Sequence, residues 1–148
     1  MISGIRSKAK RIREIIFRAD INYSVGHYSI KLPYGHSLPV FKRNYSNYDR
    51  FLPHLARYLP GGSFVVDVGA NCGDTFAGMF NENPLLNFVC VEADNVFFDY
   101  LERNVKSILS AAGKKSEVRL VKSLAGATLS NVVMTGVGGT KHAAPSGG

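Results

Sequence analysis

Apolar residues form short runs along the middle of the chain, and polar or glycine-rich segments separate them. The runs at 64–68, 87–91 and 118–123 contain several valines and are too short for helices, so they predict buried strands. Residues 75–80 and 95–109 have apolar positions at helical spacing and predict helices between those strands. This β-α-β-α-β order with short connections predicts parallel strands joined by helical crossovers.

The segments on either side of this core give weaker patterns. Residues 28–32 alternate like a short strand, and the proline- and glycine-containing stretch 33–39 predicts a loop. Apolar and aromatic positions between 48 and 59 predict a helix whose aromatic stripe packs in the core. Towards the end, 131–134 fits a fourth short strand, and 138–148 predicts a loop or loose tail because it offers little to bury.

The first residues of the chain predict an amphipathic helix with a basic outer face. Isoleucine or alanine recurs at steps of three and four from Ile2 to Ile16, and arginine and lysine lie between them. Two interpretations stay open. The helix packs on the domain with its basic side in solvent, or it makes peripheral contact with an anionic membrane surface.

Charge divides the chain into two parts. All of the net charge of +7 lies in residues 1–43, which hold nine Lys/Arg and two acids, whereas residues 44–148 are neutral. This distribution argues against nucleic acid as a partner of the whole domain. We predict a basic helix and lead-in segment over 1–45 and a ligand-binding domain over 46–148.

Composition sets further limits on the chain. Its 148 residues, 45% hydrophobic and 20% charged, are enough for one domain with a core. No apolar stretch approaches the ~20 residues that cross a bilayer, and no signal peptide is recognisable, so a cytoplasmic protein is expected. Cys72 and Cys90 predict reduced, buried thiols, and no Cys or His lies near them at metal-ligand spacing. We therefore predict no metal site.

The candidate chemistry lies after the strand at 64–68. That strand leads into a loop with glycines at 69 and 73, and a helix follows. Such loops face the crevice beyond the carboxyl end of a parallel strand, where ligands bind. Glu92 follows the next strand, where a carboxylate is well placed to accept both hydroxyls of a ribose. The pattern predicts a site for an adenosine-containing cofactor.

The loop lacks the features of other nucleotide loops. It has no G-x-G-x-x-G, and no Lys-Ser/Thr pair follows a glycine-rich run. Carboxylates at Asp67 and Asp74 would repel a pyrophosphate, but they suit a cationic amino group such as that at the methionine end of S-adenosylmethionine. Alternatives stay open: Asp67 or Asp74 as a structural acid, Glu92 as a solvated loop acid, and NAD as the ligand.

Two blocks of sequence resemble a known family. Val66-Asp-Val-Gly-Ala-Asn-Cys-Gly-Asp-Thr75 resembles the cofactor loop of the FkbM-type methyltransferases, a branch of the S-adenosylmethionine-dependent Rossmann-like enzymes. Phe88-Val-Cys-Val-Glu-Ala-Asp94 resembles the second motif of that family, which more often has Glu-Pro where this chain has Glu92-Ala93. The resemblance covers about residues 30–126.

The resemblance implies a Rossmann-like class I methyltransferase fold, a parallel sheet with helices on both faces, here apparently incomplete with three to four strands. It also implies which residues hold the methionine part of S-adenosylmethionine: Asp67, Gly69, Ala70, Asn71 and Gly73. Glu92 would hold the ribose, Ala93 would border the adenine, and Ser123 would lie near the adenine edge. Family members typically methylate hydroxyl groups on sugars or natural products, which implies a small-molecule or glycan acceptor.

The catalytic step has no assigned residue. His36 lies in the predicted 33–39 loop, either as a substrate contact or as a surface histidine, and His142 is a candidate base by residue type alone. Two functions stay open: an S-adenosylmethionine-dependent O-methyltransferase or its N-terminal portion, and a non-catalytic or degenerate cofactor- or nucleotide-binding module. Because complete enzymes of this type resemble a seven-stranded sheet, we expect a fragment or a chain that a partner completes. The sequence does not predict an oligomeric state.

Overall fold

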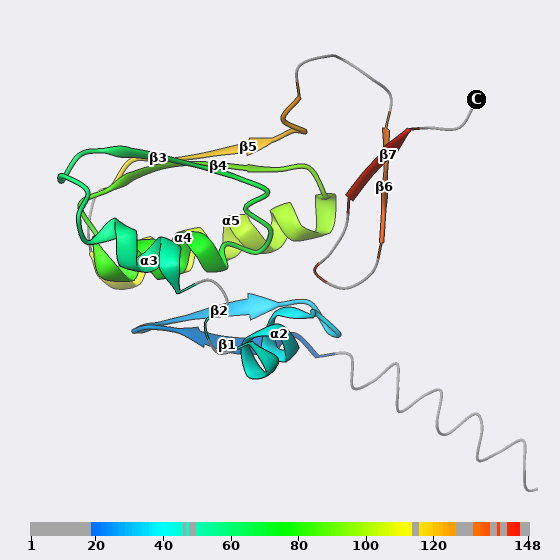
Figure 1. Cartoon of the computed structure of the whole chain (residues 1–148), viewed down its shortest axis with the longest axis horizontal. Coiled ribbons are helices and arrows are strands. Elements are labelled where there is room, and N and C mark those ends of the chain that lie inside the picture. The colour runs from blue at the N-terminus through cyan, green and yellow to red at the C-terminus, as the bar shows by residue number, and fades with distance from the viewer. Residues whose placement is uncertain are drawn as a thin grey trace, which may run out of the picture.

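The structure of the chain is a computed structural model (Figure 1), and it describes residues 19–45, 47, 50–113, 116–126, 132–136, 139 and 142–145. The elements in chain order are β1 Ile21–Val25, β2 Tyr28–Leu32, α2 Leu38–Asn44, α3 Phe51–Ala56, β3 Phe64–Val68, α4 Asp74–Glu82, β4 Asn87–Glu92, α5 Asn95–Ala112, β5 Val118–Lys122, β6 Val132–Thr135 and β7 His142–Pro145. The predicted helix over residues 2–16 lies outside the described residues.

The central sheet has the order β3-β4-β5, and all three strands are parallel. Its register places Asp67 opposite Cys90 and Cys90 opposite Leu120, so the three strands end at one edge. The predicted strands at 64–68, 87–91 and 118–123 are confirmed. Together with α4 and α5 they form a mixed α/β structure that is consistent with part of a Rossmann-like fold.

The helices of the described chain lie on one side of this sheet, and the antiparallel β1–β2 hairpin packs on the far side of α4 and α5 (Figure 1). The expectation of helices on both faces is therefore wrong for the described residues. The physical reason is topological. Successive right-handed crossovers that step in one direction place their helices on the same face, and no described strand of this sheet reverses the direction.

One hydrophobic core joins the hairpin, the helices and the covered face of the sheet. From the hairpin, Ile30 and Leu32 are fully buried, and from β4, Phe88 and Cys90 are fully buried. Helix α5 turns an apolar stripe to this core at helical spacing; its buried members are Phe97, Leu101, Asn104, Val105 and Ile108. The layers are thus hairpin, helices and sheet.

Two segments that precede β3 in the chain differ from what the sequence predicts. Strand β1 was not predicted, and it pairs with β2 through a two-residue turn at Gly26 and His27. Helix α2 begins within the stretch that predicts a loop, because Pro39 in the first turn does not interrupt helical hydrogen bonds.

The predicted helix over 48–59 is shorter than expected. Helix α3 spans Phe51–Ala56, and only Ala56 in it is buried. Phe51 and Tyr58 are 68% and 72% exposed, so the prediction that the aromatic stripe packs in the core is wrong for these residues. Helical spacing alone does not say whether another layer is present to cover the stripe.

The end of the chain also differs. The short strand predicted at 131–134 corresponds to β6, but β6 pairs antiparallel with β7 in a separate two-stranded sheet and does not join the parallel sheet. Strand β7 lies in the stretch predicted as a loose tail, and that prediction is wrong for residues 142–145. Backbone pairing between the two strands supplies hydrogen bonds that the side-chain pattern did not reveal.

Among the described residues, no helix combines the length and the apolarity that a membrane crossing requires.

Candidate functional site

The eight predicted site residues lie together at the carboxyl edge of the parallel sheet. Asp67 is the fourth residue of β3, Glu92 is the last residue of β4, and Ser123 follows β5 directly. The loop after β3 is attached to β4, since the N–H groups of Gly69 and Ala70 both donate to the Val91 carbonyl, at 2.9 and 3.0 Å. This places the loop over the ends of two strands.

Glu92 holds the loop and the following turn in place. Its carboxylate accepts the Asn71 N–H at Oε2, at 2.8 Å, and the Asp94 N–H at Oε1, at 2.7 Å. The Glu92 residue is 7% exposed, and its carbonyl accepts the Ser123 N–H at 3.1 Å. The open alternative of a solvated loop acid is therefore wrong. Each carboxylate oxygen has a second lone pair, which leaves acceptor capacity for a ligand.

Asn71 is the most constrained residue of the loop. It has a φ of +50°, the one described non-glycine residue with positive φ, which a short amide side chain tolerates better than most. Its Oδ1 accepts the Cys72 N–H at 2.8 Å, and its Nδ2 donates to the Gly139 carbonyl at 3.2 Å. Gly139, between β6 and β7 in the chain, thus lies against the loop.

His36 also contacts the Asn71 side chain. Its Nε2 lies 2.9 Å from Asn71 Oδ1, and its Nδ1 accepts the Leu38 N–H at 3.2 Å, which assigns the proton to Nε2. The ring is 6% exposed and packs edge-on against Phe97 at 5.5 Å between centroids. Burial lowers the pKa of His36, so the neutral form is favoured.

This geometry decides one of the two alternatives that the sequence left open for His36. His36 is not a surface histidine, and both ring nitrogens are engaged within the protein, so it is not placed to take a proton from a substrate. It positions the loop through Asn71. Sequence reasoning located the residue but missed this role, because the contact joins positions 36 and 71 and is tertiary.

Asn104 is a second residue that sequence reasoning missed as a member of the site. Its Nδ2 donates to the Lys31 carbonyl and the Cys72 carbonyl, both at 2.8 Å, and its Oδ1 accepts the Lys31 N–H at 2.8 Å. It is 3% exposed on the apolar stripe of α5. An amide on an otherwise apolar helix face was the available signal, since a buried amide requires partners.

The neighbouring acids have local structural roles. Asp94 is the N-cap of α5, and its Oδ1 accepts the N–H groups of Val96 and Phe97, each at 3.0 Å. Asp74 is the first residue of α4, where the helix dipole favours a negative charge. The open alternative of a structural acid thus fits Asp74.

The two glycines of the loop, Gly69 and Gly73, have different roles. Gly69 has a φ of +81°, and no described atom lies within 4 Å of where a Cβ would be. The space beside it is therefore open to a ligand that approaches the backbone. Gly73 has a φ of +88° and serves a different purpose, since a Cβ there would lie 2.9 Å from the Leu101 side chain. It lets α4 start close to α5.

Both cysteines are free and buried, as the sequence predicted. Burial raises the pKa of the Cys90 thiol to about 12 and raises that of Cys72 as well, and nearby carboxylates add to both. Neither is therefore a nucleophile at neutral pH. In the part of the chain that the structure describes, no group of three His, Cys, Asp or Glu residues is arranged to hold a metal ion.

Comparison with known proteins gives remote similarities. No family profile matches the chain, and no curated protein matches its sequence. Among solved structures, the plantazolicin methyltransferase BpumL in complex with SAH has a TM-score of 0.40 and 10% identity over 59% of this chain and 33% of its own. A protein-L-isoaspartate O-methyltransferase has a TM-score of 0.40 and 15% identity over 76% of this chain and 31% of its own. The chain spans about a third of the length of these structures.

Proposed function

We propose that this chain binds S-adenosylmethionine and forms the cofactor-binding part of a methyltransferase of the FkbM type. The observation that carries the proposal is the Asn71–Glu92 contact. It joins a glycine loop at the end of β3 to a carboxylate at the end of the neighbouring parallel strand. That juxtaposition is where dinucleotide and adenosine ligands bind in open α/β sheets.

The residues present fit the cofactor in two respects. The open space at Gly69 admits a ligand against the backbone, and the carboxylates of Asp67 and Glu92 provide negative charge near a sulfonium or amino group. In our proposal Asp67, Gly69, Ala70, Asn71 and Gly73 hold the methionine part. Glu92 uses its remaining lone pairs for the ribose hydroxyls, and Ala93 and Ser123 border the adenine.

The cofactor supplies an electrophilic methyl group, and the chain's own residues bind and orient it. For methyl transfer to a hydroxyl, alignment of the acceptor with the methyl group contributes most, and a base that removes the proton contributes further. We propose a hydroxyl on a sugar or natural-product scaffold as the acceptor, as in the family that the two motifs resemble. No base is assigned within the described residues.

The first prediction is that S-adenosylhomocysteine binds the folded chain in isothermal titration calorimetry and that Glu92→Ala weakens binding. Loss of charge-assisted hydrogen bonds should cost about 1.5–3 kcal/mol of binding free energy, roughly tenfold or more in Kd. Because Glu92 also holds the loop, Glu92→Gln is measured beside it; it keeps one acceptor and should lie between wild type and Ala.

Glu102→Ala serves as the matched control. Glu102 is an exposed acid on α5, away from the sheet edge, and its loss should leave binding unchanged. Absence of heat for S-adenosylhomocysteine with a folded chain would contradict the cofactor proposal. Tight binding of NAD in its place would favour the dinucleotide alternative.

A non-catalytic cofactor-binding module is the second candidate. The observation that favours it is the Gly139 carbonyl on Asn71, which places another segment of the chain against the loop on which a cofactor would lie. The two candidates differ in turnover. A chain that binds S-adenosylhomocysteine but transfers no labelled methyl group to hydroxyl acceptors would be such a module.

A further inference from the structure

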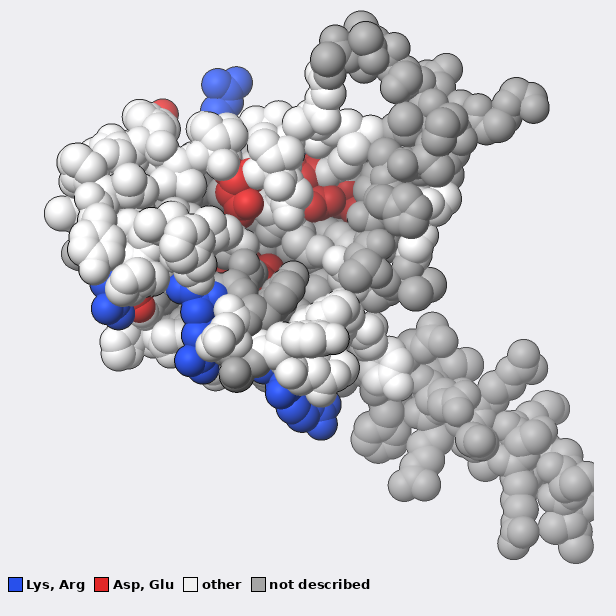
Figure 2. Space-filling model, viewed as in Figure 1, with Lys and Arg blue, Asp and Glu red and all other residues white. Residues whose placement is uncertain are grey.

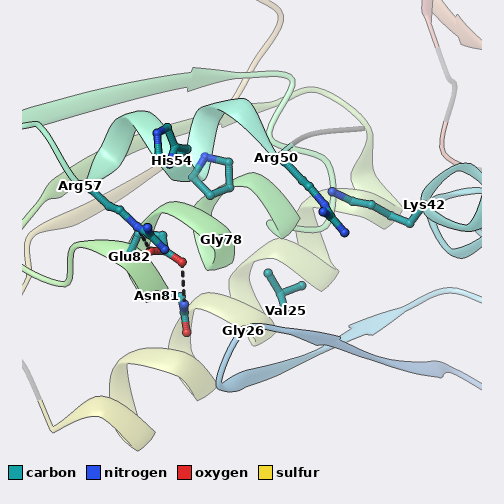
Figure 3. A pocket seen from close by; sticks show the side chains of 10 residues that line it. Val25, Gly26, Lys42, Arg50, His54, Arg57, Gly78, Asn81 and Glu82 are labelled. Carbon is teal, nitrogen blue, oxygen red and sulfur yellow. Dashed lines mark hydrogen bonds and ion pairs between the residues drawn. The ribbon is translucent and has the colours of Figure 1, made fainter. Parts of the chain in front are cut away.

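A cavity of about 330 Å³ lies on the outer side of α4, away from the loop after β3. Its walls come from the turn between β1 and β2, from α2 and α3, and from α4 (Figure 3). An adjoining cavity of about 320 Å³ shares part of this lining and extends to Asp74 and Thr75 in the first turn of α4. None of the eight proposed cofactor residues lines either cavity.

Basic side chains gather at these cavities. Lys42 and Arg50 line both of them, and Figure 3 shows the two side chains extending toward one another from α2 and from the start of α3. Among the described residues, the Arg50 side chain has no ion-pair or hydrogen-bond partner. Two cations that converge attract an anion more strongly than either does alone.

One acid of this region, Glu82, is paired within the protein. Arg57 forms an ion pair with Glu82, and the other Glu82 oxygen accepts from Asn81 Nδ2 at 3.2 Å. Hydrogen bonding to Arg57 lowers the pKa of Glu82, as expected for a paired carboxylate. Among the described residues, the charged groups lining the two cavities are Lys42, Arg50, Arg57, Glu82 and Asp74, three cations against two anions, and His54 adds positive charge when protonated.

Close backbone contacts hold the cavity walls in place. A Cβ at Gly26 would lie 2.3 Å from the Asn81 side chain, and one at Gly78 would lie 2.8 Å from Pro53 Cγ. The His27 N–H donates to Asn81 Oδ1 at 2.8 Å, which fixes the hairpin turn to α4. The cavity therefore lies between elements that pack tightly.

We propose that this cavity binds an oxyanion, a phosphate or sulfate group, through Arg50 and Lys42. Arginine presents a planar fork of donors that matches the oxygens of such groups, and lysine adds a compact charge. A volume of this size admits a phosphomonoester on a small organic molecule as well as the free anion. The proposal stands independently of methyl transfer.

The distribution of charge over the surface agrees with this assignment. Figure 2 shows Lys and Arg side chains mainly along the lower border of the visible face, whereas the larger patches of Asp and Glu lie towards its middle. An anionic ligand is thus attracted to the border and repelled from the acids near the sheet edge. The acidic sheet edge and the basic cavity attract ligands of opposite charge.

The test is calorimetric titration of the folded chain with inorganic phosphate. Wild type should bind, and Arg50→Gln should weaken binding by about tenfold or more, the usual effect of losing a charge-assisted contact. Lys42→Gln should also weaken binding, and Arg50→Lys should keep part of it. Arg43→Gln is the matched control, because Arg43 is an exposed neighbour on α2 that lines neither cavity.

A second arm distinguishes the sources of the anion. Glucose 6-phosphate that binds more tightly than phosphate, with glucose itself inactive, would indicate a phosphorylated organic ligand, and equal affinities would indicate the free anion. No binding of either anion at about 10 mM, or equal binding by wild type and Arg50→Gln, would overturn the proposal. Circular dichroism of each variant excludes loss of folding as the cause.

Discussion

The two faces of the parallel sheet differ sharply in what covers them. On one face Phe88 and Cys90 of β4 are fully buried beneath the helices. On the other face Phe64, Val66 and Val68 of β3 are 56%, 62% and 61% exposed, and no described residue packs over them. Within the described chain β3 also pairs with β4 alone, so one of its edges is open.

Strand β3 therefore has apolar side chains on a face that no described layer of the structure covers. Strands that are apolar on both faces are typical of parallel sheets with a layer on each side. Three large apolar side chains on one exposed face form a surface of the kind that packs against another layer. The covered face, in contrast, is complete enough to fix the site at the sheet edge. Stability and the site should therefore depend mainly on the covered face.

Replacing a phenylalanine on each face gives the largest contrast. Phe88→Ala should lower the free energy of unfolding by about 3–5 kcal/mol, because it opens a cavity beside Phe76, whose ring centroid is 4.9 Å away. Phe64→Ala, the same change on the open face, should cost less than about 1 kcal/mol. Urea denaturation followed by circular dichroism measures both. Equal losses would show that the two faces are covered alike in solution.

The cysteines test whether the covered face excludes solvent. Burial raises the pKa of the Cys90 thiol to about 12 and raises that of Cys72 as well, so both thiols stay protonated in the folded protein at about pH 8. Neither cysteine should therefore react with a disulfide reagent until urea unfolds the chain. As the pH rises, the thiols of the unfolded state lose their protons before the thiols of the folded state do. The free energy of unfolding should therefore fall as the pH rises above the ordinary thiol pKa of 9.0.

Cys90→Ala should reduce that fall, which separates the thiol from other groups that titrate in the same range. Fast labelling of the folded chain at about pH 8 would mean that the covered face opens readily, and the contrast with the open face would lose its basis.

The smallest effect is expected on the open face itself. Val66→Thr should change the free energy of unfolding by less than about 0.5 kcal/mol, because the side chain is exposed in the described structure. Val65→Thr is the matched variant on the covered face, where burial of a hydroxyl should cost about 1–3 kcal/mol. A loss for Val66→Thr as large as that for Val65→Thr would show that something covers the open face in solution.

The parts of the fold that the sequence predicted are those with dense local signals. Valine-rich runs indicated β3, β4 and β5, the glycines after β3 indicated the loop, and the stripe from Phe97 to Ile108 indicated α5. The positions of Asp67, Glu92 and Ser123 at one sheet edge followed from the parallel order. These predictions succeed because each depends on neighbours in the chain and on one topological rule.

The failures share a different cause. The apolar stripe on α3 has helical spacing, but no described layer covers it. The helices lie on one face of the sheet because the crossovers step in one direction, and residue patterns along the chain do not show that direction. The contacts of His36 and Asn104 join residues 35 and 73 positions apart. Such partners become visible only when the elements are assembled, so a pattern read along the chain identifies neither.

Asn104 has a consequence for how the molecule opens. Its side chain binds the Lys31 backbone in the hairpin and the Cys72 carbonyl in the loop through one amide group. Separating the hairpin from α5 breaks two of the three hydrogen bonds of that amide and exposes to water the third, which supports the loop. The hairpin and the loop should therefore unfold locally as one cooperative unit, although one is at the outer layer and the other is at the sheet edge.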